Sequence, residues 1–136
     1  MTDMGQPPDQ ILASTTPQHN QCLVDVTFMQ TMLGADADRQ RRYYVKFIQA
    51  IKDGLETINL AVNDHISPII EQECHRLKSN ARTIGALPLG EQLEQMEHNY
   101  KSMSQDEVLA HAQQLNTLFD QTCTYLQHLG LLDTKP

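Results

Sequence analysis

The sequence contains no tryptophan, few other aromatic residues and few cations, and each shortage narrows what the chain can be. Only 5% of its 136 residues are aromatic, and the apolar residues are mostly Leu, Ile, Val, Met and Ala. This composition favours packed helices over a β-sandwich. Ten Lys and Arg against 17 Asp and Glu give a formal charge of −7. Because binding to nucleic acid or an anionic membrane needs a basic face, we expect neither partner.

Long apolar runs and paired cysteines are also missing. No stretch approaches the roughly 18 consecutive apolar residues of a transmembrane helix, and the opening MTDMGQPPDQ lacks the basic and apolar regions of a secretory signal. Cys22, Cys74 and Cys123 are odd in number and lack CxxC spacing, which indicates reduced thiols rather than disulfides or zinc. We therefore expect a cytoplasmic protein, and the lack of a second apolar stripe predicts a monomer.

Composition divides the chain into three parts. Residues 1–20 are rich in Pro, Gln, Thr and Ser without a sustained period, so we expect a flexible N-terminal tail. Residues 21–130 carry the periodic segments and should form one domain. Residues 131–136 are expected to be a C-terminal tail.

Apolar residues in this domain recur at steps of three and four, the spacing of one face of an α-helix. A short helix is predicted at residues 25–33, ending at Gly34, and four longer helices follow it. Their predicted core residues, helix by helix, are Tyr44, Phe47, Ile48, Ile51, Leu55, Ile58 and Val62; Ile70, Cys74, Leu77, Ala81 and Ile84; Leu89, Leu93, Met96 and Tyr100; and Val108, Ala112, Leu115, Phe119, Thr122, Leu126 and Leu129.

Local signals mark the ends of these helices. Ser67 is the predicted N-cap of the second long helix, with Pro68 as its first residue, and Gly85 marks its end. Ser104 with Glu107 matches a capping box at the start of the last helix. Since no segment alternates with period two, we predict an all-α fold, an antiparallel up-down four-helix bundle with a short extra N-terminal helix.

The stretch HRLKSNARTIGA, residues 75–86, is unusual in this acidic chain because it holds three cations and no acid. On a helical wheel His75 projects about 140° away from the core direction, so it should be exposed. Lys78, Ser79 and Arg82 follow it by three, four and seven residues, the spacings that share one helix face. We expect His75 to lie in solvent beside two cations and a hydroxyl.

This arrangement suits phosphoryl chemistry. The cations should attract an anion and disfavour protonation of the imidazole, which would leave it nucleophilic. A neutral imidazole can accept a phosphoryl group, and Lys78 and Arg82 could offset its negative charges. Exposed histidines with basic neighbours also occur without such a role, so these residues leave the function open.

The same stretch resembles the phosphoacceptor motif of histidine-containing phosphotransfer (HPt) domains. The residues that carry the resemblance are His75, Leu77, Lys78, Ala81, Ile84, Gly85 and Ala86, with Leu93 and Glu94 as the family's downstream Leu-Glu pair. The predicted helix order over residues 25–129 agrees with the family as well. Ser79 occupies the position where the family usually has Gly, which indicates a narrower choice of partner or different rates rather than loss of function.

The resemblance implies a phosphorelay intermediate, not an enzyme with its own substrate. His75 would accept a phosphoryl group from a receiver-domain aspartate and pass it to another, the receivers belonging to a hybrid histidine kinase and a response regulator. The other implied site residues are Lys78, Arg82 and Ser79 for the phosphoryl group, and Gln72, Arg76, Ser79, Phe28 and Met29 for the receiver. No cofactor is implied in this chain, because the receiver would supply Mg²⁺.

Three other functions are weighed against this one. A metal-binding bundle would use inward Glu-x-x-His pairs, but the chain has Glu71/His75 and Glu94/His98 at spacing four, and its remaining histidines are interpreted as surface residues. A binding module or inhibitor that docks a receiver or kinase without phosphotransfer would carry the same docking surface. An autonomous enzyme is disfavoured, because the sequence has no nucleotide-binding loop, kinase signature or G-x-S-x-G motif.

Overall fold

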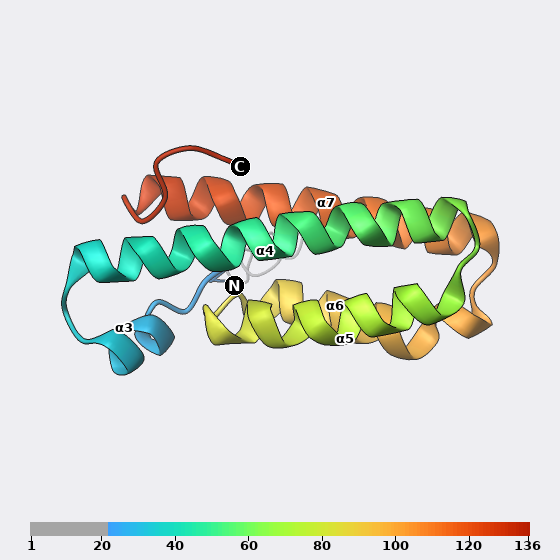
Figure 1. Ribbon diagram of the computed structural model, residues 1–136, viewed down its shortest axis with the longest axis horizontal. Helices are drawn as coiled ribbons and strands as arrows, with labels where there is room; N and C mark the ends of the chain where they lie inside the picture. The colour runs from blue at the N-terminus through green and yellow to red at the C-terminus, as the bar shows by residue number, and fades with distance from the viewer. Residues whose placement is uncertain (1–21) are drawn as a thin grey trace, which may run out of the picture.

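The computed structural model describes residues 22–136, and this part of the chain is helical (Figure 1). It contains five α-helices, one 3-10 helix and no strand within that range, so the predicted all-α fold is confirmed. The predicted N-terminal tail lies outside the described residues. Among the helices described, none combines the length and apolar character needed to cross a membrane.

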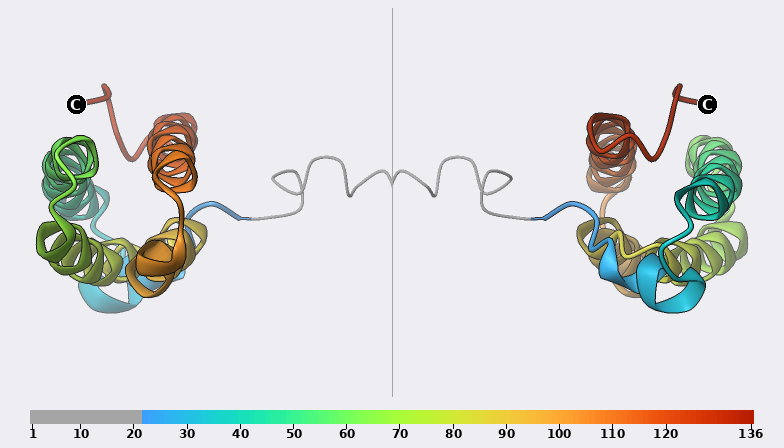
Figure 2. Two further views of the ribbon diagram at one scale, coloured as in Figure 1. Left: turned by 90° about the vertical axis from the view of Figure 1, so that its right-hand side faces the viewer. Right: turned by 90° about the vertical axis from the view of Figure 1, so that its left-hand side faces the viewer.

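Four long helices and one short helix make up the fold. In chain order the elements are α3 (Thr27–Leu33), α4 (Ala37–Asn63), α5 (Ser67–Thr83), α6 (Leu87–Asn99), η2 (Tyr100–Ser102) and α7 (Gln105–His128). α4 and α6 each contact both α5 and α7, and α3 packs against α4. Successive long helices run in opposite directions (Figure 1), and they follow one another around the long axis (Figure 2). This order places α5 and α6 side by side.

The apolar stripes of the four long helices meet in one core. Tyr44, Leu77, Leu93 and Leu115 come from four different helices, and each is fully buried. Burial of side chains of this size stabilises a fold by roughly 1.5–3 kcal/mol each. Leu129 was wrongly predicted to belong to the core: it lies just beyond the end of α7 and is 47% exposed.

The predicted helix ends are confirmed in one place and wrong in another. At the start of α7, Ser104 Oγ accepts the backbone N–H of Glu107 at 3.1 Å, and the Glu107 carboxylate accepts that of Ser104 at 2.8 Å, which completes the capping box. Ser67, in contrast, is the first residue of α5 and not its N-cap. The helix begins one residue early because the Ile66 carbonyl already accepts the N–H of Ile70.

Two glycines bring other segments close to α5. A Cβ atom on Gly54 of α4 would lie 2.5 Å from a methyl carbon of Leu77, so Leu77 packs directly onto the α4 backbone. Gly85, just after α5, has a φ of +77°, and a Cβ there would collide with the carbonyl oxygen of Asp25. The Asp25 N–H donates to the Gly85 carbonyl at 2.8 Å. The segment before α3 is thereby attached to the end of α5.

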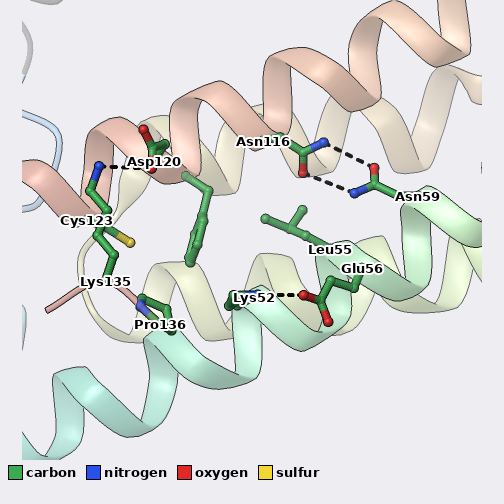
Figure 3. A pocket seen from close by; sticks show the side chains of 10 residues that line it. Lys52, Leu55, Glu56, Asn59, Asn116, Asp120, Cys123, Lys135 and Pro136 are labelled. Carbon is green, nitrogen blue, oxygen red and sulfur yellow. Dashed lines mark hydrogen bonds and ion pairs between the residues drawn. The ribbon is translucent and has the colours of Figure 1, made fainter.

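The α4–α7 side of the bundle contains a groove of about 310 Å³ (Figure 3). The side-chain amides of Asn59 and Asn116 exchange two hydrogen bonds between these helices, at 3.4 and 3.2 Å. Lys135 Nζ lies 3.0 Å from a carboxylate oxygen of Asp120, and Leu132 is buried. The C-terminal segment, assigned to a tail from the sequence, thus lies against the bundle, while the domain boundaries themselves stay a prediction.

The three cysteines are free. Burial raises the pKa of the Cys74 thiol to about 12 and that of Cys123 to about 11. Both thiols are therefore protonated and unreactive at neutral pH, as expected for small core residues. Cys22 is exposed, with its Sγ 3.3 Å from the hydroxyl of Tyr125.

The interpretation of the remaining histidines as surface residues is wrong for His111. It lies among the core-facing residues of α7, is 9% exposed, and its Nε2 has no hydrogen-bond partner among residues 22–136. Burial lowers the pKa of His111 below its usual value, and a hydrogen bond involving the Gln92 backbone opposes that shift only in part. The folded protein therefore favours the neutral ring.

The stability of the fold should depend on the contact at Gly85. A left-handed φ costs a non-glycine residue roughly 1–2 kcal/mol, and the collision with Asp25 adds to this cost. We expect Gly85→Ala to lower the free energy of unfolding by more than about 2 kcal/mol in urea titrations. Gly130→Ala is the matched control, because Gly130 has a φ of +75° and a methyl group added there would have no atom of the described residues within 4 Å. Equal losses at the two positions would contradict a role for the Asp25 contact.

His111 should make stability depend on pH. The unfolded chain protonates this histidine near its ordinary pKa of about 6.5, whereas the folded chain resists protonation because its pKa is lowered. Stability is therefore fully present above about pH 6.5 and declines as the pH falls below it. We expect the melting temperature to fall on acidification below that pH, and to fall less in His111→Leu. His98→Leu, which changes an exposed histidine of α6, should keep the wild-type slope.

Candidate functional site

His75 lies on the outward face of α5, and its side chain is 67% exposed, in agreement with the helical wheel. Cys74 and Leu77 on either side of it are buried in the core. Because residues of one helix face share one direction, this packing turns His75 outward. A hollow of about 540 Å³ adjoins the ring, lined by Pro68, Glu71, Gln72, His75 and Glu97.

Glu97 of α6 fixes the orientation of the imidazole. Its Oε2 lies 3.0 Å from Nδ1 of His75. A carboxylate can only accept a hydrogen bond, so Nδ1 carries the hydrogen and Nε2 of the neutral ring has a free lone pair. Burial raises the pKa of the Glu97 carboxyl, but contacts with Lys78 and His75 outweigh it and hold the pKa below its usual value. Glu97 is therefore a carboxylate at neutral pH.

Lys78 shares this carboxylate. Its Nζ lies 2.7 Å from Oε1 of Glu97, and both side chains are only 12% exposed. The contact is an ion pair without the alignment of a hydrogen bond. The sequence predicts an exposed Lys78, and this is wrong because α6 covers that side of α5. On the wheel Lys78 lies only about 80° from the core direction, at the edge of the buried face.

The other two cations of the stretch also contact carboxylates. Arg82 donates to Glu94, and its aliphatic stem crosses Gly90, where a Cβ would lie 3.2 Å from Cγ of Arg82. Arg76 pairs with Glu73 at 2.6 Å. The sequence predicts a surplus of positive charge here. The prediction is wrong for the described residues, because α6 and the preceding turn of α5 supply one carboxylate for each cation.

The family model of the Hpt domain matches residues 42–127 of this chain. The chain belongs to the Hpt domain family. The match covers α5 and α6 completely, and so includes His75 and Glu97. Comparisons with curated proteins and with solved structures give no match. Hpt domains carry out histidine phosphotransfer in two-component systems and interact with receiver domains and histidine kinases.

Most residues predicted to contact a partner lie on the surface of this Hpt domain. Gln72 and Ser79 are exposed on α5, and Phe28 of α3 is 41% exposed. The prediction that Met29 contacts a partner is wrong. Met29 is fully buried, because α3 packs against the core through this residue. Met32 lies one turn after Phe28 and is 54% exposed, so the apolar surface of α3 consists of Phe28 and Met32 instead.

The metal-binding alternative requires several ligands that converge on one point. Within residues 22–136 of this Hpt domain, no group of three or more His, Cys, Asp or Glu side chains is placed to hold a metal ion. Glu71 and His98, members of the two Glu/His pairs considered from the sequence, are exposed rather than directed into the bundle.

Glu97 was not found from the sequence. It lies 22 residues from His75 on a different helix, and a glutamate on the polar face of an amphipathic helix is an ordinary surface residue. The sequence did contain one indication of its position. Glu97 follows Glu94, the glutamate that corresponds to the family's Leu-Glu pair, by three residues. Residues three apart share a helix face, so both carboxylates lie on the side of α6 next to α5.

The tautomer of His75 can be tested directly. If Glu97 holds a hydrogen on Nδ1, long-range ¹H–¹⁵N NMR spectra of the neutral ring should show Nε2 as the nitrogen without hydrogen. In Glu97→Ala the population should move toward the Nε2–H tautomer, which the free side chain prefers. Glu71→Gln, which changes another carboxylate of the same hollow, should leave the spectrum unchanged. A hydrogen on Nε2 in the wild type would contradict the assigned geometry.

Proposed function

We propose that this Hpt domain is a phosphorelay intermediate in which Nε2 of His75 accepts a phosphoryl group from one receiver-domain aspartate and gives it to another. The observation that carries the proposal is the exposed ring of His75, whose Nδ1 is engaged by Glu97 so that Nε2 is free. The proposed receivers belong to a hybrid histidine kinase and a response regulator.

The accepting step begins with the lone pair on Nε2 of His75. It attacks the phosphorus of the aspartyl phosphate, so that a P–N bond forms while the P–O bond to the aspartate breaks. The bonding electron pair leaves with the aspartate carboxylate. The ring becomes positively charged and keeps its hydrogen on Nδ1. Onward transfer is the reverse reaction with the aspartate of a second receiver.

We propose that Lys78 and Ser79 stabilise the phosphoryl group on His75. Lys78 has three donors on a flexible stem, so it can reach a phosphoryl oxygen while it stays beside Glu97. Ser79 follows His75 by four residues and lies on the same helix face. Arg82 is about 10 Å further along the helix and donates to Glu94, so its proposed contribution is long-range charge.

The proposed receiver-binding surface surrounds His75 and extends to α3. It consists of Gln72, Arg76 and Ser79 on α5 with Phe28 on α3, and it excludes the buried Met29. The hollow beside His75, about 540 Å³ in volume, offers room for a side chain of the partner. Mg²⁺ in this scheme belongs to the receiver, and we propose no cofactor for the chain described here.

We also infer that α4, α5, α6 and α7 form an antiparallel up-down four-helix bundle that acts as a monomeric, cytoplasmic phosphocarrier and not as an enzyme. The alternating helix directions (Figure 1) and the contacts of each long helix with two others support the arrangement. Membership of the Hpt family supports the carrier role.

Phosphotransfer to His75 provides the test. Incubation with a ³²P-phosphorylated receiver or hybrid kinase should label the chain with an acid-labile, base-stable phosphoryl group, and His75→Gln should abolish the label. His98→Gln, which changes an exposed histidine of α6, should retain it. Label that persists in His75→Gln would refute the assignment of the acceptor. A phosphorylated receiver that binds the chain without labelling it would instead support a non-transferring binding module.

A further inference from the structure

Three cations on α4 differ from the other cations of the described chain. Seven of the ten Lys and Arg residues form an ion pair with a carboxylate. The remaining three are Arg39, Arg42 and Lys46, which are exposed and form no ion pair within residues 22–136. Although the chain has a formal charge of −7, unpaired cations thus gather within residues 39–46.

The three cations lie on one face of α4, which we call the α4 basic face. Arg42 and Lys46 follow Arg39 by three and seven residues, the spacings that share a helix face. At a rise of 1.5 Å per residue, the three charges span about 10 Å along the helix axis. The buried residues Tyr44 and Ile48 mark the opposite side of the helix. α3, α5 and α7 pack against other sides of α4 (Figure 2), so the α4 basic face is open to solvent.

The carboxylates nearest to these cations along the chain have other partners. Asp36 is the N-cap of α4 and accepts the backbone N–H of Arg39 at 3.1 Å. Asp38 pairs with Arg41. Asp53 accepts a hydrogen bond at 3.0 Å from the side-chain amide one turn before it. The three cations are therefore able to pair with carboxylates of another molecule.

We propose that the α4 basic face docks an acidic segment of a partner protein. Charge complementarity carries the inference, because the face presents three positive charges that no carboxylate of residues 22–136 pairs with. A matching segment needs two or three carboxylates spread over about 10 Å, which two turns of a helix or about four extended residues provide. The half-buried ring of Tyr43, with its centroid 6.0 Å from Nζ of Lys46, adds an apolar edge.

A short acidic segment suits this face better than a membrane or a nucleic acid. Exposed carboxylates border the face at both ends, with Asp36 and Asp38 before it and Asp53 after it. A bilayer or a duplex presents negative charge over a wider area, so it would also meet these carboxylates within the Debye length of about 8–10 Å. A segment of about 10 Å contacts only the cations.

The α4 basic face is separate from the proposed receiver-binding surface, which consists of residues of α5 and α3. Binding to it leaves His75 accessible on α5. A partner held at α4 would raise the effective concentration of a receiver domain joined to the same segment. The docking itself does not depend on phosphotransfer, so it can be tested on the unphosphorylated chain.

The test is a titration of the full, ¹⁵N-labelled chain with N-acetylated, C-amidated hexaglutamate. Amide shifts in ¹H–¹⁵N spectra should change mainly at residues 39–46, and added salt should weaken the binding because the charges are exposed. The triple variant Arg39→Gln, Arg42→Gln, Lys46→Gln should raise the Kd by about tenfold, since each exposed charge pair contributes a few-fold. All three residues are exposed, so the variant should keep the wild-type helical CD signal.

A second triple variant is the matched control. Lys52→Gln, Lys101→Gln, Lys135→Gln removes the same charge from cations that are paired with carboxylates, and it should keep the wild-type Kd. Equal losses in the two variants would overturn the inference, because attraction would then follow the net charge. Shifts centred outside residues 39–46, or no binding of hexaglutamate at low salt, would overturn it as well.

Two further probes distinguish the class of partner. Vesicles of phosphatidylserine and phosphatidylcholine and a single-stranded oligothymidylate should compete poorly with hexaglutamate at equal salt. Stronger binding of either probe to residues 39–46 would overturn the assignment to an acidic protein segment. His75→Gln should bind hexaglutamate as the wild type does, and a loss there would contradict a separate surface. Failure of His75 to accept a phosphoryl group would count against the proposed function alone.

Discussion

The packing of Leu77 onto Gly54 is the contact on which the geometry of the site depends. Gly54 has no side chain, so Leu77 lies directly on the α4 backbone and α5 can approach α4 closely. This contact, with the buried Cys74 one turn before it, fixes the rotation of α5 about its axis. His75 then has only one direction available, toward solvent. The exposure of the acceptor is thus a consequence of core packing.

The second determinant of the site is the pairing of α5 with α6. Gly90 allows the stem of Arg82 to lie across α6, and Glu94 and Glu97 then contact the cations of α5. The local result is a nearly balanced set of charges, not a basic patch. A phosphoryl group on His75 would therefore meet one shielded ion pair beside the ring, and attraction of an anion from a distance is weak at such a site.

The positions of the helices along the chain, and one of their caps, could be predicted from the sequence. Helices follow from apolar residues at steps of three and four, and the capping box of Ser104 and Glu107 is a local pattern that the structure confirms. One error is local: Ser67 is the first residue of α5 and not its N-cap, because the Ile66 carbonyl already accepts the N–H of Ile70. The other errors concern burial by tertiary packing, as for Met29 and His111, which are buried in the fold.

By itself the sequence determined the acceptor candidate, because the angle between His75 and the apolar stripe of its own helix follows from residue spacing along the chain. The tertiary structure decided what surrounds that ring. Glu97 is 22 residues away along the chain, and the contacts of a carboxylate with His75 and Lys78 exist only once α6 lies beside α5. Helical periodicity gives the direction in which a side chain points from the axis of its own helix. Which residue of another helix that side chain contacts depends on how the two helices pack.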